Sequence, residues 1–281
     1  MPSKTILVTG CSSGIGLVTA TGLKARGYRV FATARKPEDL EMLSQLGLET
    51  LPLDYSSSDS VRQCFAGLME KSEGQLYGLF NNGAYGQPGA VEDLTRDTLR
   101  MQFEANFFGW HELTRLAIPV MRSHGKGRIV HNSSVLGFAA MPFRGAYNAS
   151  KFALEGLTDT LRLELRGSGI SVSLIEPGPI LSRFRANALH ALKENIDIEQ
   201  SIYRDNYKGA LARLAKEGPA APFTLPPEAV LGKVIHALES RRPRPRYYVT
   251  VPTYLFGILK RLLGTRQLDR VLYMAGGEGK R

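Results

Sequence analysis

The chain has 281 residues, of which 43% are hydrophobic and 22% are charged, and this composition is typical of a folded globular protein. Its two cysteines, Cys11 and Cys64, are too few for a disulfide scaffold and lack the spacing of metal ligands, so we expect no metal and a reducing, cytoplasmic setting. The formal net charge is +10, but residues 204–281 hold 15 Lys and Arg against 6 Asp and Glu, and this uneven charge, without a recognisable nucleic-acid-binding module, argues against nucleic acid as a partner.

Short apolar runs rich in β-branched residues alternate with helix-like stretches through the first two-thirds of the chain. This alternation predicts an α/β fold of Rossmann type, a doubly wound parallel sheet with helices on both faces, in a single domain. The first run begins so close to Met1 that it leaves no room for a signal segment, so we expect no export. The expected strands are Thr5–Thr9, Arg29–Thr33, Thr50–Asp54, Leu76–Asn81, Arg128–Asn132 and Ile170–Ile175. The expected helices are Ile15–Arg26, Asp59–Glu70, Thr98–Met121 and Gly145–Arg166.

A glycine-rich turn follows the first expected strand and opens the first helix. Its first glycine can make the turn, its second lets the backbone approach a pyrophosphate, and its third lets the helix pack closely. The helix N-terminus then presents unpaired N–H groups to anionic oxygens. The glycine spacing differs from the commoner G-x-G-x-x-G, so a purely structural turn remains the alternative. The residues expected to bind a dinucleotide here are Gly10, Ser12, Ser13, Gly14, Ile15 and Gly16.

The end of the second expected strand indicates which dinucleotide is bound. An NAD-selective Rossmann unit usually has an acidic residue there for the ribose diol, but this chain has Ala34, Arg35 and Lys36. Arg35 offers planar, permanently charged donors that suit a 2′-phosphate, and the loop serines can add hydroxyl contacts. The sequence therefore predicts NADP(H), with a solvated basic loop as the alternative.

Tyr147 and Lys151 are four residues apart in an expected helix, so their side chains share one face. A fixed cation near a phenol favours the phenolate and brings it closer to proton transfer at neutral pH. Y-x-x-x-K alone is usually a simple pair on a helix surface, and its meaning depends on neighbouring motifs. Those neighbours are Ser133 and Ser134 at the end of a strand, Asn106, and the run Asn81–Gly83.

Beyond Gly178 the sequence changes to short polar and aromatic segments, which indicates a lid and a sheet edge attached to one domain. We expect a cofactor and catalytic core over 1–182, a substrate lid over 183–227, and over 228–281 a helix at Glu228–Leu238, a strand at Tyr247–Val251 and a basic tail. Apolar lid residues either contact substrate or pack internally. These are Phe184, Leu189, Leu192, Ile196, Ile202 and Tyr203.

The tail contains an apolar stripe at helical spacing beside basic residues. It is too short to span a bilayer, so it either covers the active-site mouth or a neighbouring subunit, or rests on a membrane surface. We favour the packing or lid role, because short amphipathic segments usually complete cores. The stripe consists of Leu255, Phe256, Ile258, Leu259 and Leu262, and the basic residues are Lys260, Arg261 and Arg266.

Taken in order from Thr9 to Ser182, the motifs T-G-x-x-x-G-I-G, D-Y-S, N-N-G-A, N-F-F-G, S-S-V-L-G, Y-N-A-S-K and E-P-G-P-I resemble the short-chain dehydrogenase/reductase family in its compact single-domain form. More narrowly, the chain resembles the branch with 17-beta-hydroxysteroid and retinol dehydrogenases, and bacterial NADP(H)-dependent aldehyde reductases. Two departures stand out. The usual N-N-A-G reads N-N-G-A, with Gly83 and Ala84 transposed, and Ser182 replaces the commoner threonine.

The resemblance implies a role for each matching residue. Tyr147 would be the acid/base, Lys151 would bind the nicotinamide ribose and lower the tyrosine pKa, and Ser134, or less favourably Ser133, would hydrogen-bond the substrate oxygen. Asn106 would hold a water that links Lys151 to solvent. The remaining cofactor contacts would come from Asp54 at the adenine with its neighbour Tyr55, Asn82 and Gly83 at the adenosine ribose, and Pro177, Gly178, Ile180 and Ser182 around the nicotinamide.

The sequence thus predicts an enzyme that moves a hydride between NADP(H) and a small, fairly apolar carbonyl or alcohol, and that assembles as a homodimer or homotetramer. A non-catalytic dinucleotide-binding regulator on the same fold, or a protein peripheral to the membrane, is the alternative.

Overall fold

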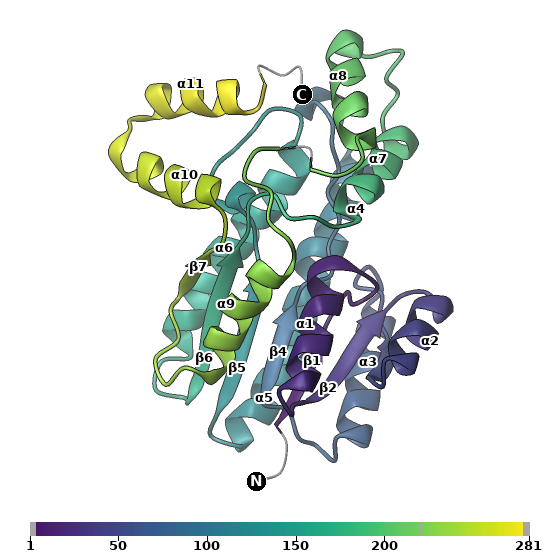
Figure 1. Cartoon of the computed structure of the whole chain (residues 1–281), viewed down its shortest axis with the longest axis vertical. Coiled ribbons are helices and arrows are strands. Elements are labelled where there is room, and N and C mark those ends of the chain that lie inside the picture. Colours follow the sequence, from purple (N-terminus) through teal and green to yellow (C-terminus); the bar gives the residue numbers. More distant parts are fainter. Residues whose placement is uncertain (1–3, 220, 278–281) are drawn as a thin grey trace.

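The computed structural model describes residues 4–219 and 221–277, and its centre is a seven-stranded sheet in the order β3-β2-β1-β4-β5-β6-β7 (Figure 1). Every neighbouring pair of strands is parallel. The expected doubly wound Rossmann-type sheet is therefore confirmed. The strands are β1 (Thr5–Val8), β2 (Arg29–Ala34), β3 (Glu49–Pro52), β4 (Gly78–Asn81), β5 (Gly127–Asn132), β6 (Ile170–Glu176) and β7 (Arg246–Tyr248).

Alternating side chains of the strands enter two separate cores, which explains why the strands read as continuous apolar runs. Ile6 and Val8 of β1 face the layer of α1, α2 and α9, whereas Leu7 between them faces the layer of α3, α5 and α6. Figure 1 shows α1 and α9 in front of the sheet. The helices of the two layers are α1 (Gly14–Ala25), α2 (Pro37–Gln45), α3 (Ser58–Lys71), α5 (Gly109–Ser123), α6 (Gly145–Glu164) and α9 (Glu228–Glu239).

Three elements of the sheet and of its two helix layers differ from the sequence expectations. Helix α2 was not predicted, although Pro37 at its first turn and the acidic Glu38 and Asp39 behind it are typical helix-start signals. The expected helix Thr98–Met121 is divided into α4 (Arg96–Phe103), a π-helical turn η2 (Glu104–Phe108) and α5. The expected strand Tyr247–Val251 is shortened to β7, because helix α10 already begins at Val251.

Four further helices rise above the carboxyl ends of the strands in two groups (Figure 1). One group is α7 (Phe184–Asn195) with α8 (Arg204–Ala215), and the other is α10 (Val251–Leu262) with α11 (Thr265–Ala275). Single turns of 3₁₀ helix, η1 (Val91–Asp93) and η3 (Val135–Gly137), lie in the loops beneath them. None of the described helices is long and apolar enough to cross a bilayer.

Most of the expected lid side chains pack internally rather than facing a cavity. Leu192 and Ile196 are buried in a small core with Tyr207 of α8, and Leu189 and Tyr203 pack against that core. The cavity described below is lined instead by Phe184 and by small or polar residues of α7, and Ile202 is 81% exposed. The sequence left substrate contact and internal packing as equal alternatives for these side chains. Internal packing is the more common outcome.

The tail helices rest on the loop that follows β5. Phe256 and Leu272 are buried against Val135 and Phe138, and Leu259 packs beside them. A charge cluster fixes the strand that leads into the tail, because the guanidinium of Arg246 in β7 contacts Glu155 of α6 and Glu176 of β6. Both carboxylates are buried, so this one arginine holds the sheet edge to the helix layer.

Candidate active site

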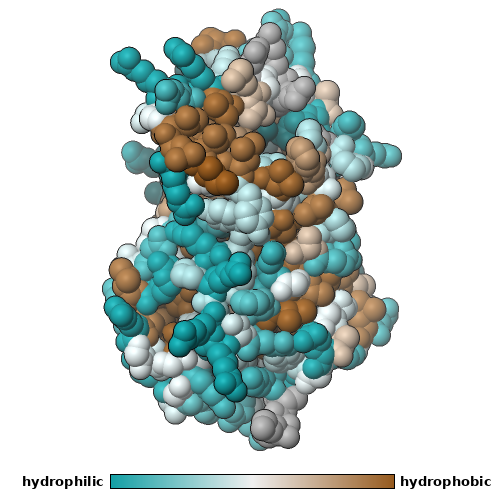
Figure 2. All heavy atoms as spheres, turned by 60° about the vertical axis from the view of Figure 1, so that its left-hand side comes forward, coloured by the Kyte–Doolittle hydropathy of each residue, from teal (hydrophilic) through white to brown (hydrophobic). Residues whose placement is uncertain are grey.

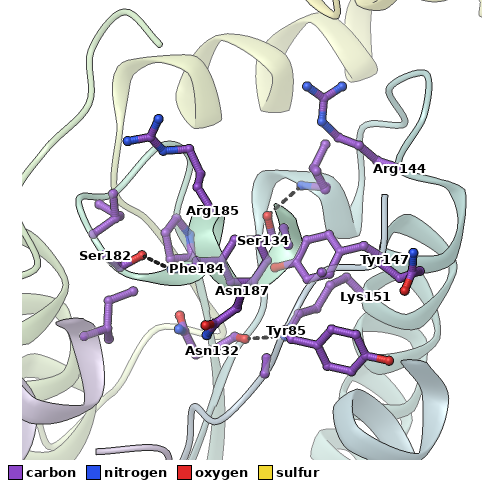
Figure 3. Close-up of a pocket in the computed structure, with 18 of the residues that line it drawn as sticks. Tyr85, Asn132, Ser134, Arg144, Tyr147, Lys151, Ser182, Phe184, Arg185 and Asn187 are labelled. Carbon is purple, nitrogen blue, oxygen red and sulfur yellow. Dashed lines mark hydrogen bonds between the residues drawn. The ribbon is translucent and has the colours of Figure 1, made fainter. Parts of the chain in front are cut away.

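A large cavity of about 1310 Å³ lies at the carboxyl ends of the strands, where ligands bind in open α/β sheets. At one end it is lined by Arg35 and Asp54, and at the other by Ser134, Tyr147 and residues of α7, α8 and α10. Its volume exceeds that of a typical small-ligand pocket, so it has room for a dinucleotide and a second molecule. Figure 3 shows the second region, with Ser134, Tyr147 and Lys151 on one side and Phe184 and Arg185 on the other.

The glycine-rich turn brings two backbone segments into contact. Gly10 has a φ of +65°, and a Cβ there would lie 2.5 Å from the Cα of Gly83. A Cβ on Gly16 would lie 2.1 Å from the carbonyl oxygen of Gly10. Both positions therefore require glycine, because any side chain would push the β1 loop away from the β4 loop or from α1. Of the other predicted loop residues, Ser12, Ser13 and Ile15 line the cavity.

The transposition of Gly83 and Ala84 has a simple structural account. Gly83 is packed between Gly10 and the ring of Tyr55, where a Cβ would have contacts of 3.3–3.4 Å. Ala84 is not among the residues with a positive φ, so it needs none of the conformational freedom of glycine. Its methyl group packs against the core on the α5 side of the sheet. The transposition thus leaves the loop unstrained.

A hydrogen-bond network joins the ends of four strands beneath the cavity. The Thr9 hydroxyl accepts hydrogen bonds from the backbone N–H of Asn82 (2.9 Å) and the hydroxyl of Tyr55 (2.9 Å). The Asn82 amide donates to the Thr9 carbonyl, and its oxygen accepts from the side chain of Asn132 (2.9 Å). Tyr55 also lies 2.6 Å from the Asn81 side-chain oxygen, so its hydroxyl is turned toward the protein, although the residue lines the cavity. The network fixes the floor of the predicted adenosine region.

The residues predicted to select the cofactor lie at the outer end of the cavity. Arg35 is exposed and lines it, whereas Lys36 precedes α2 outside the lining, with its ammonium 3.8 Å from Glu38. Asp54 also lines the cavity, and its carboxylate accepts hydrogen bonds from the backbone and hydroxyl of Ser56. The guanidinium of Arg35 has no ion pair among the described residues.

Ser134 and Tyr147 meet at the opposite end of the cavity (Figure 3). Burial raises the pKa of Tyr147 to about 12, and a hydrogen bond with Ser134 opposes part of that rise. Ser134 is held in place because its oxygen accepts the backbone N–H of Leu136 at 3.1 Å. Ser133 lies against Gly137 and Glu155 instead, as the clash of a Cβ on Gly137 with its oxygen shows. Ser134 therefore has the hydroxyl that faces Tyr147, and Ser133 is the weaker candidate.

Lys151 lies one helical turn after Tyr147 and is completely enclosed. Its ammonium donates a 2.8 Å hydrogen bond to the carbonyl of Asn132 and lies 4.2 Å from the ring centre of Trp110. Burial lowers the pKa of Lys151 to about 7, and the charge of Glu155 works against that shift. The helix therefore carries an ionisable phenol and an ionisable amine with opposite pKa shifts, a feature that is common where proton transfer occurs.

Asn106 lies in the π-helical turn η2, a distortion often found at functional sites. Its side-chain amide donates to the carbonyl of Tyr85 at 2.9 Å and accepts the backbone N–H of the same residue at 3.2 Å. It is fully buried and does not line the cavity. The same side-chain amide nitrogen also donates to the hydroxyl of Ser150 in α6 at 3.4 Å, so Asn106 joins the loop after β4 to that helix. Its water link stays a prediction.

The loop after β6 forms the remaining wall. Pro177, Gly178, Ile180 and Ser182 all line the cavity. A Cβ on Gly178 would lie 2.2 Å from the Thr250 hydroxyl, so this loop is pressed against the start of α10. Ser182 accepts the backbone N–H of Phe184 at 3.3 Å, which helps to begin α7.

Several lining residues escaped prediction, Asn132 and Arg144 among them, and another was predicted only as part of the lid. Asn132 holds both Asn82 and Lys151, and Arg144 lines the same region with its guanidinium pointing away from the ring of Tyr147 (Figure 3). Phe184, expected as apolar lid surface, meets the ring of the same tyrosine at 5.3 Å between centres. A sequence signal exists for Arg144, which precedes Tyr147 by three residues and so shares its helix face. No group of three metal-ligating side chains occurs within the described ranges.

Comparisons with known proteins agree with this arrangement. Residues 4–193 match the family described as short chain dehydrogenase. An uncharacterized oxidoreductase of Escherichia coli K12, YbbO, is 45% identical over 96% of this chain and 94% of its own length. Human retinol dehydrogenase 8 is 34% identical over 85% of this chain and 79% of its own length.

Two solved structures share the fold but carry different cofactors. A single-residue variant of actinorhodin polyketide ketoreductase with NADPH is 27% identical, with a TM-score of 0.72 over 88% of this chain and 95% of that one. A short-chain dehydrogenase/reductase from Burkholderia phymatum in complex with NAD is 24% identical, with a TM-score of 0.75 over 92% of each chain. The fold binds a nicotinamide dinucleotide in either form, so the choice must come from the residues of this chain.

The depressed pKa of Lys151 predicts a pH-dependent stability difference between the native chain and Lys151→Met. Between about pH 7 and pH 10 the unfolded state binds a proton that native Lys151 has released, so the free energy of unfolding of the native chain should rise with pH relative to the variant, by on the order of a few kcal/mol in total. Loss of the Asn132 hydrogen bond shifts the comparison equally at every pH. Urea denaturation across this range measures the slope.

The exposed Lys126→Met is the matched control and should show no such slope relative to the native chain. A stability difference for Lys151→Met that stays constant from about pH 7 to pH 10 would contradict the depressed pKa.

Proposed function

Since the chain belongs to the short-chain dehydrogenase/reductase family, we propose that it is an NADP(H)-dependent oxidoreductase that interconverts a carbonyl compound and its alcohol, acting on CH–OH groups. The observation that carries the proposal is the meeting of Ser134 and Tyr147 at the cavity wall, with Lys151 buried one turn behind. A non-catalytic dinucleotide-binding regulator would not need this set of three, so the intact set favours catalysis.

The residues present fit a bound dinucleotide. The β1 loop has no side chain at Gly10 where a Cβ would block the approach to Gly83, and α1 opens directly behind it. Ser12, Ser13, Ile15, Asp54, Asn82 and Gly83 would hold the adenosine and pyrophosphate portions, and Pro177, Gly178, Ile180 and Ser182 would hold the nicotinamide. When bound, the nicotinamide supplies or accepts the hydride.

The protein side of the reaction is general acid–base chemistry. Tyr147 gives its phenolic proton to the carbonyl oxygen during reduction and takes it back during oxidation, while Ser134 hydrogen-bonds the same oxygen. Because burial raises the pKa of Tyr147 to about 12, the phenol needs a nearby positive charge to act as a base. Protonated Lys151, present at and below about pH 7, is the candidate source of that charge, and Asn106 would hold the water that returns its proton to solvent.

The substrate region favours a compound with apolar surface. Leu136, Met141, Phe184, Val251 and Leu255 line it beside Tyr147. This lining supports an aldehyde, ketone, steroid-like or retinoid-like substrate. The segment 183–227 would act as the lid over it.

Exposed apolar side chains on the α6 side of the molecule support assembly into a homodimer or homotetramer. Phe152 and Leu163 of α6 and Phe108 of η2 are 40%, 68% and 48% exposed. Large apolar groups gathered in this way commonly mark a protein–protein surface. Light scattering on the purified chain measures the assembly.

Tyr147→Phe tests the assignment of the acid/base. Turnover in a panel of aldehydes, ketosteroids, retinal and short ketones should fall by at least ~100-fold, the scale of lost general acid–base catalysis, while binding of NADPH stays nearly intact. NADPH consumption measures turnover, and fluorescence titration measures binding. Tyr273→Phe, which removes a hydroxyl from a half-exposed ring on α11, is the control. Near-normal turnover by folded Tyr147→Phe would remove Tyr147 from the mechanism.

Arg35 should make the enzyme prefer NADP(H). A charge-assisted hydrogen bond contributes about 1.5–3 kcal/mol, so kcat/KM should favour NADP(H) over NAD(H) by roughly tenfold to a hundredfold. The double change Ala34→Asp with Arg35→Ala should reverse the preference, because it removes an attraction and adds a repulsion. Lys36→Ala, outside the cavity lining, should change it much less. Equal or better use of NADH by the unaltered enzyme would refute this role of Arg35.

The outer face of α10 and α11 supports a peripheral contact between an otherwise cytoplasmic protein and a membrane. Figure 2 shows apolar side chains gathered on this part of the surface. Exposed Tyr254, Ile258 and Leu262 of α10 lie on the same helix as Lys260 and Arg261, and Leu255 of that helix also lines the cavity. An apolar face beside cations is suited to an anionic lipid surface, from which an apolar substrate could enter.

Ile258→Ser with Leu262→Ser tests this contact. The native chain should sediment with anionic vesicles at low salt and less at high salt, and the double variant should lose most of that binding. Leu163→Ser, an exposed apolar change on α6, should bind as the native chain does. Failure of the native chain to sediment would leave packing and cavity closure as the role of α10.

A further inference from the structure

Three arginines surround the substrate end of the cavity without any acidic partner. Arg144, Arg185 and Arg213 all line it, and none of them forms an ion pair within the described part of the chain. Figure 3 places Arg144 and Arg185 around the same space as Ser134 and Tyr147. The acidic residue of α7 that shares the lining, Glu194, is paired with His190 at 3.0 Å.

Arg144 is held rigidly at this position. It precedes α6 by one residue, and the adjacent Phe143 has a φ of +59°, in the left-handed region that non-glycine residues rarely adopt. The ring of Phe143 packs edge-on against Tyr203 and Tyr207 of the lid, each at 5.5 Å between centres. The guanidinium makes a single hydrogen bond within the described residues, from Nη1 to the carbonyl of Pro142. A strained backbone at Phe143 therefore precedes a guanidinium that makes only this one hydrogen bond within the described residues.

Arg185 and Arg213 differ in how far their hydrogen-bond donors are already used. Arg185 donates hydrogen bonds to the carbonyls of Arg213, Lys216 and Gly218, so it satisfies the end of α8 and is occupied. Arg213 has a buried Nε with no hydrogen-bond partner in the described structure. Of these three arginines, Arg144 and Arg213 thus have guanidinium donors to spare.

The arginines line one cavity, and each of Arg144 and Arg213 is influenced by a neighbouring positive charge. Burial and, to a smaller extent, the charge of Arg213 lower the pKa of Arg144 to about 10. Burial likewise lowers the pKa of Arg213, with a second contribution from the charge of Arg185. Unpaired, partly desolvated like charges destabilise a fold, and an anion bound between them would relieve both the desolvation and the repulsion. Arginine is also the side chain best suited to grip carboxylate or phosphate oxygens with two donors.

We propose that the physiological substrate carries an anionic group, a carboxylate or a phosphate monoester, which Arg144 and Arg213 bind while its carbonyl or alcohol lies at Tyr147. This inference rests on the proposed function and narrows its substrate class to amphipathic molecules, apolar in the middle and charged at the end remote from the reacting carbon. Neutral steroid-like and retinoid-like compounds would then be weaker substrates than oxo acids of similar size.

A matched series of probes tests the proposal. Short, medium and long ω-oxo carboxylates would be assayed with NADPH beside their neutral methyl esters and beside the corresponding ω-oxo alkyl phosphates. For at least one chain length the native enzyme should show a kcat/KM at least about tenfold higher for an anionic probe than for its ester, and added salt should reduce that ratio. The carboxylate and phosphate arms distinguish the two anions.

Substitutions assign the preference to the arginines. Arg213→Gln and Arg144→Gln should each lower the ratio of anion to ester by about tenfold, and Arg213→Lys should retain part of it. Because the ratio compares two substrates in one variant, a general loss of folding or chemistry cancels. Arg204→Gln removes the same charge from α8 at a residue outside the cavity lining and should leave the ratio unchanged.

A binding measurement separates this proposal from the proposed function. Calorimetry with a long-chain dicarboxylate, which has no carbonyl to reduce, should show binding that its dimethyl ester lacks and that Arg213→Gln abolishes. Such binding without reduction of any probe would uphold the anion site and overturn hydride transfer. Equal kcat/KM for acids, phosphates and esters, or an anion preference that neither glutamine variant alters, would overturn the anion site and leave hydride transfer intact.

Discussion

The contact between the backbones of Gly10 and Gly83 is the constraint on which the site depends. Parallel pairing puts β1 beside β4 at the point where the strand order reverses, and the two loops that leave these strands meet with no room for a Cβ. With the loops in contact, the hydroxyl of Thr9 reaches the backbone of Asn82, and Asn82 in turn holds Asn132. The carbonyl of Asn132 then receives the ammonium of Lys151. One backbone contact near the N-terminus is therefore linked, through three polar steps, to the helix that carries Tyr147.

The sequence predicts those parts of the site that are formed by residues close together in the chain. The glycine turn, the cation at Arg35 and the four-residue spacing of Tyr147 and Lys151 are each contained in a few residues, so they can be recognised in the sequence, and the family resemblance supplies the roles expected of Tyr147 and Lys151. What escapes prediction depends on packing between distant segments. Arg144 and Arg213 are far apart in the chain and line the same cavity only because α8 packs against the residue before Arg144, and Phe184 becomes a wall of the cavity beside Tyr147. The division of the expected helix Thr98–Met121 by a π-turn is likewise invisible in a pattern that stays helical throughout.

At the edge of the sheet an arginine is paired with buried carboxylates. Arg246 reaches two buried carboxylates, Glu155 of α6 and Glu176 of β6, and so joins the last strand to the helix that carries Tyr147 and to the strand that leads into Pro177. Desolvation and the nearby charge of Glu155 raise the pKa of Glu176 to about 8 against the pull of Arg246. This cluster has its cation and its anions in contact, and its contribution is to fix the position of the strand from which α10 continues. The part of the cavity wall that α10 forms is therefore anchored, through β7, to this charge cluster.

The Arg246 cluster at the sheet edge and the cavity arginines Arg144 and Arg213 differ in whether a carboxylate contacts the guanidinium. At the sheet edge the guanidinium is matched by carboxylates, as expected when a buried charge serves the fold. Around the cavity Arg144 and Arg213 have no such match among the described residues, and Lys151 is buried with a hydrogen bond to a carbonyl but without a carboxylate in contact. Stability alone would favour apolar side chains at all three positions. Their presence around one cavity supports the proposed anion site for Arg144 and Arg213, and for Lys151 it supports the proposed proton transfer at Tyr147.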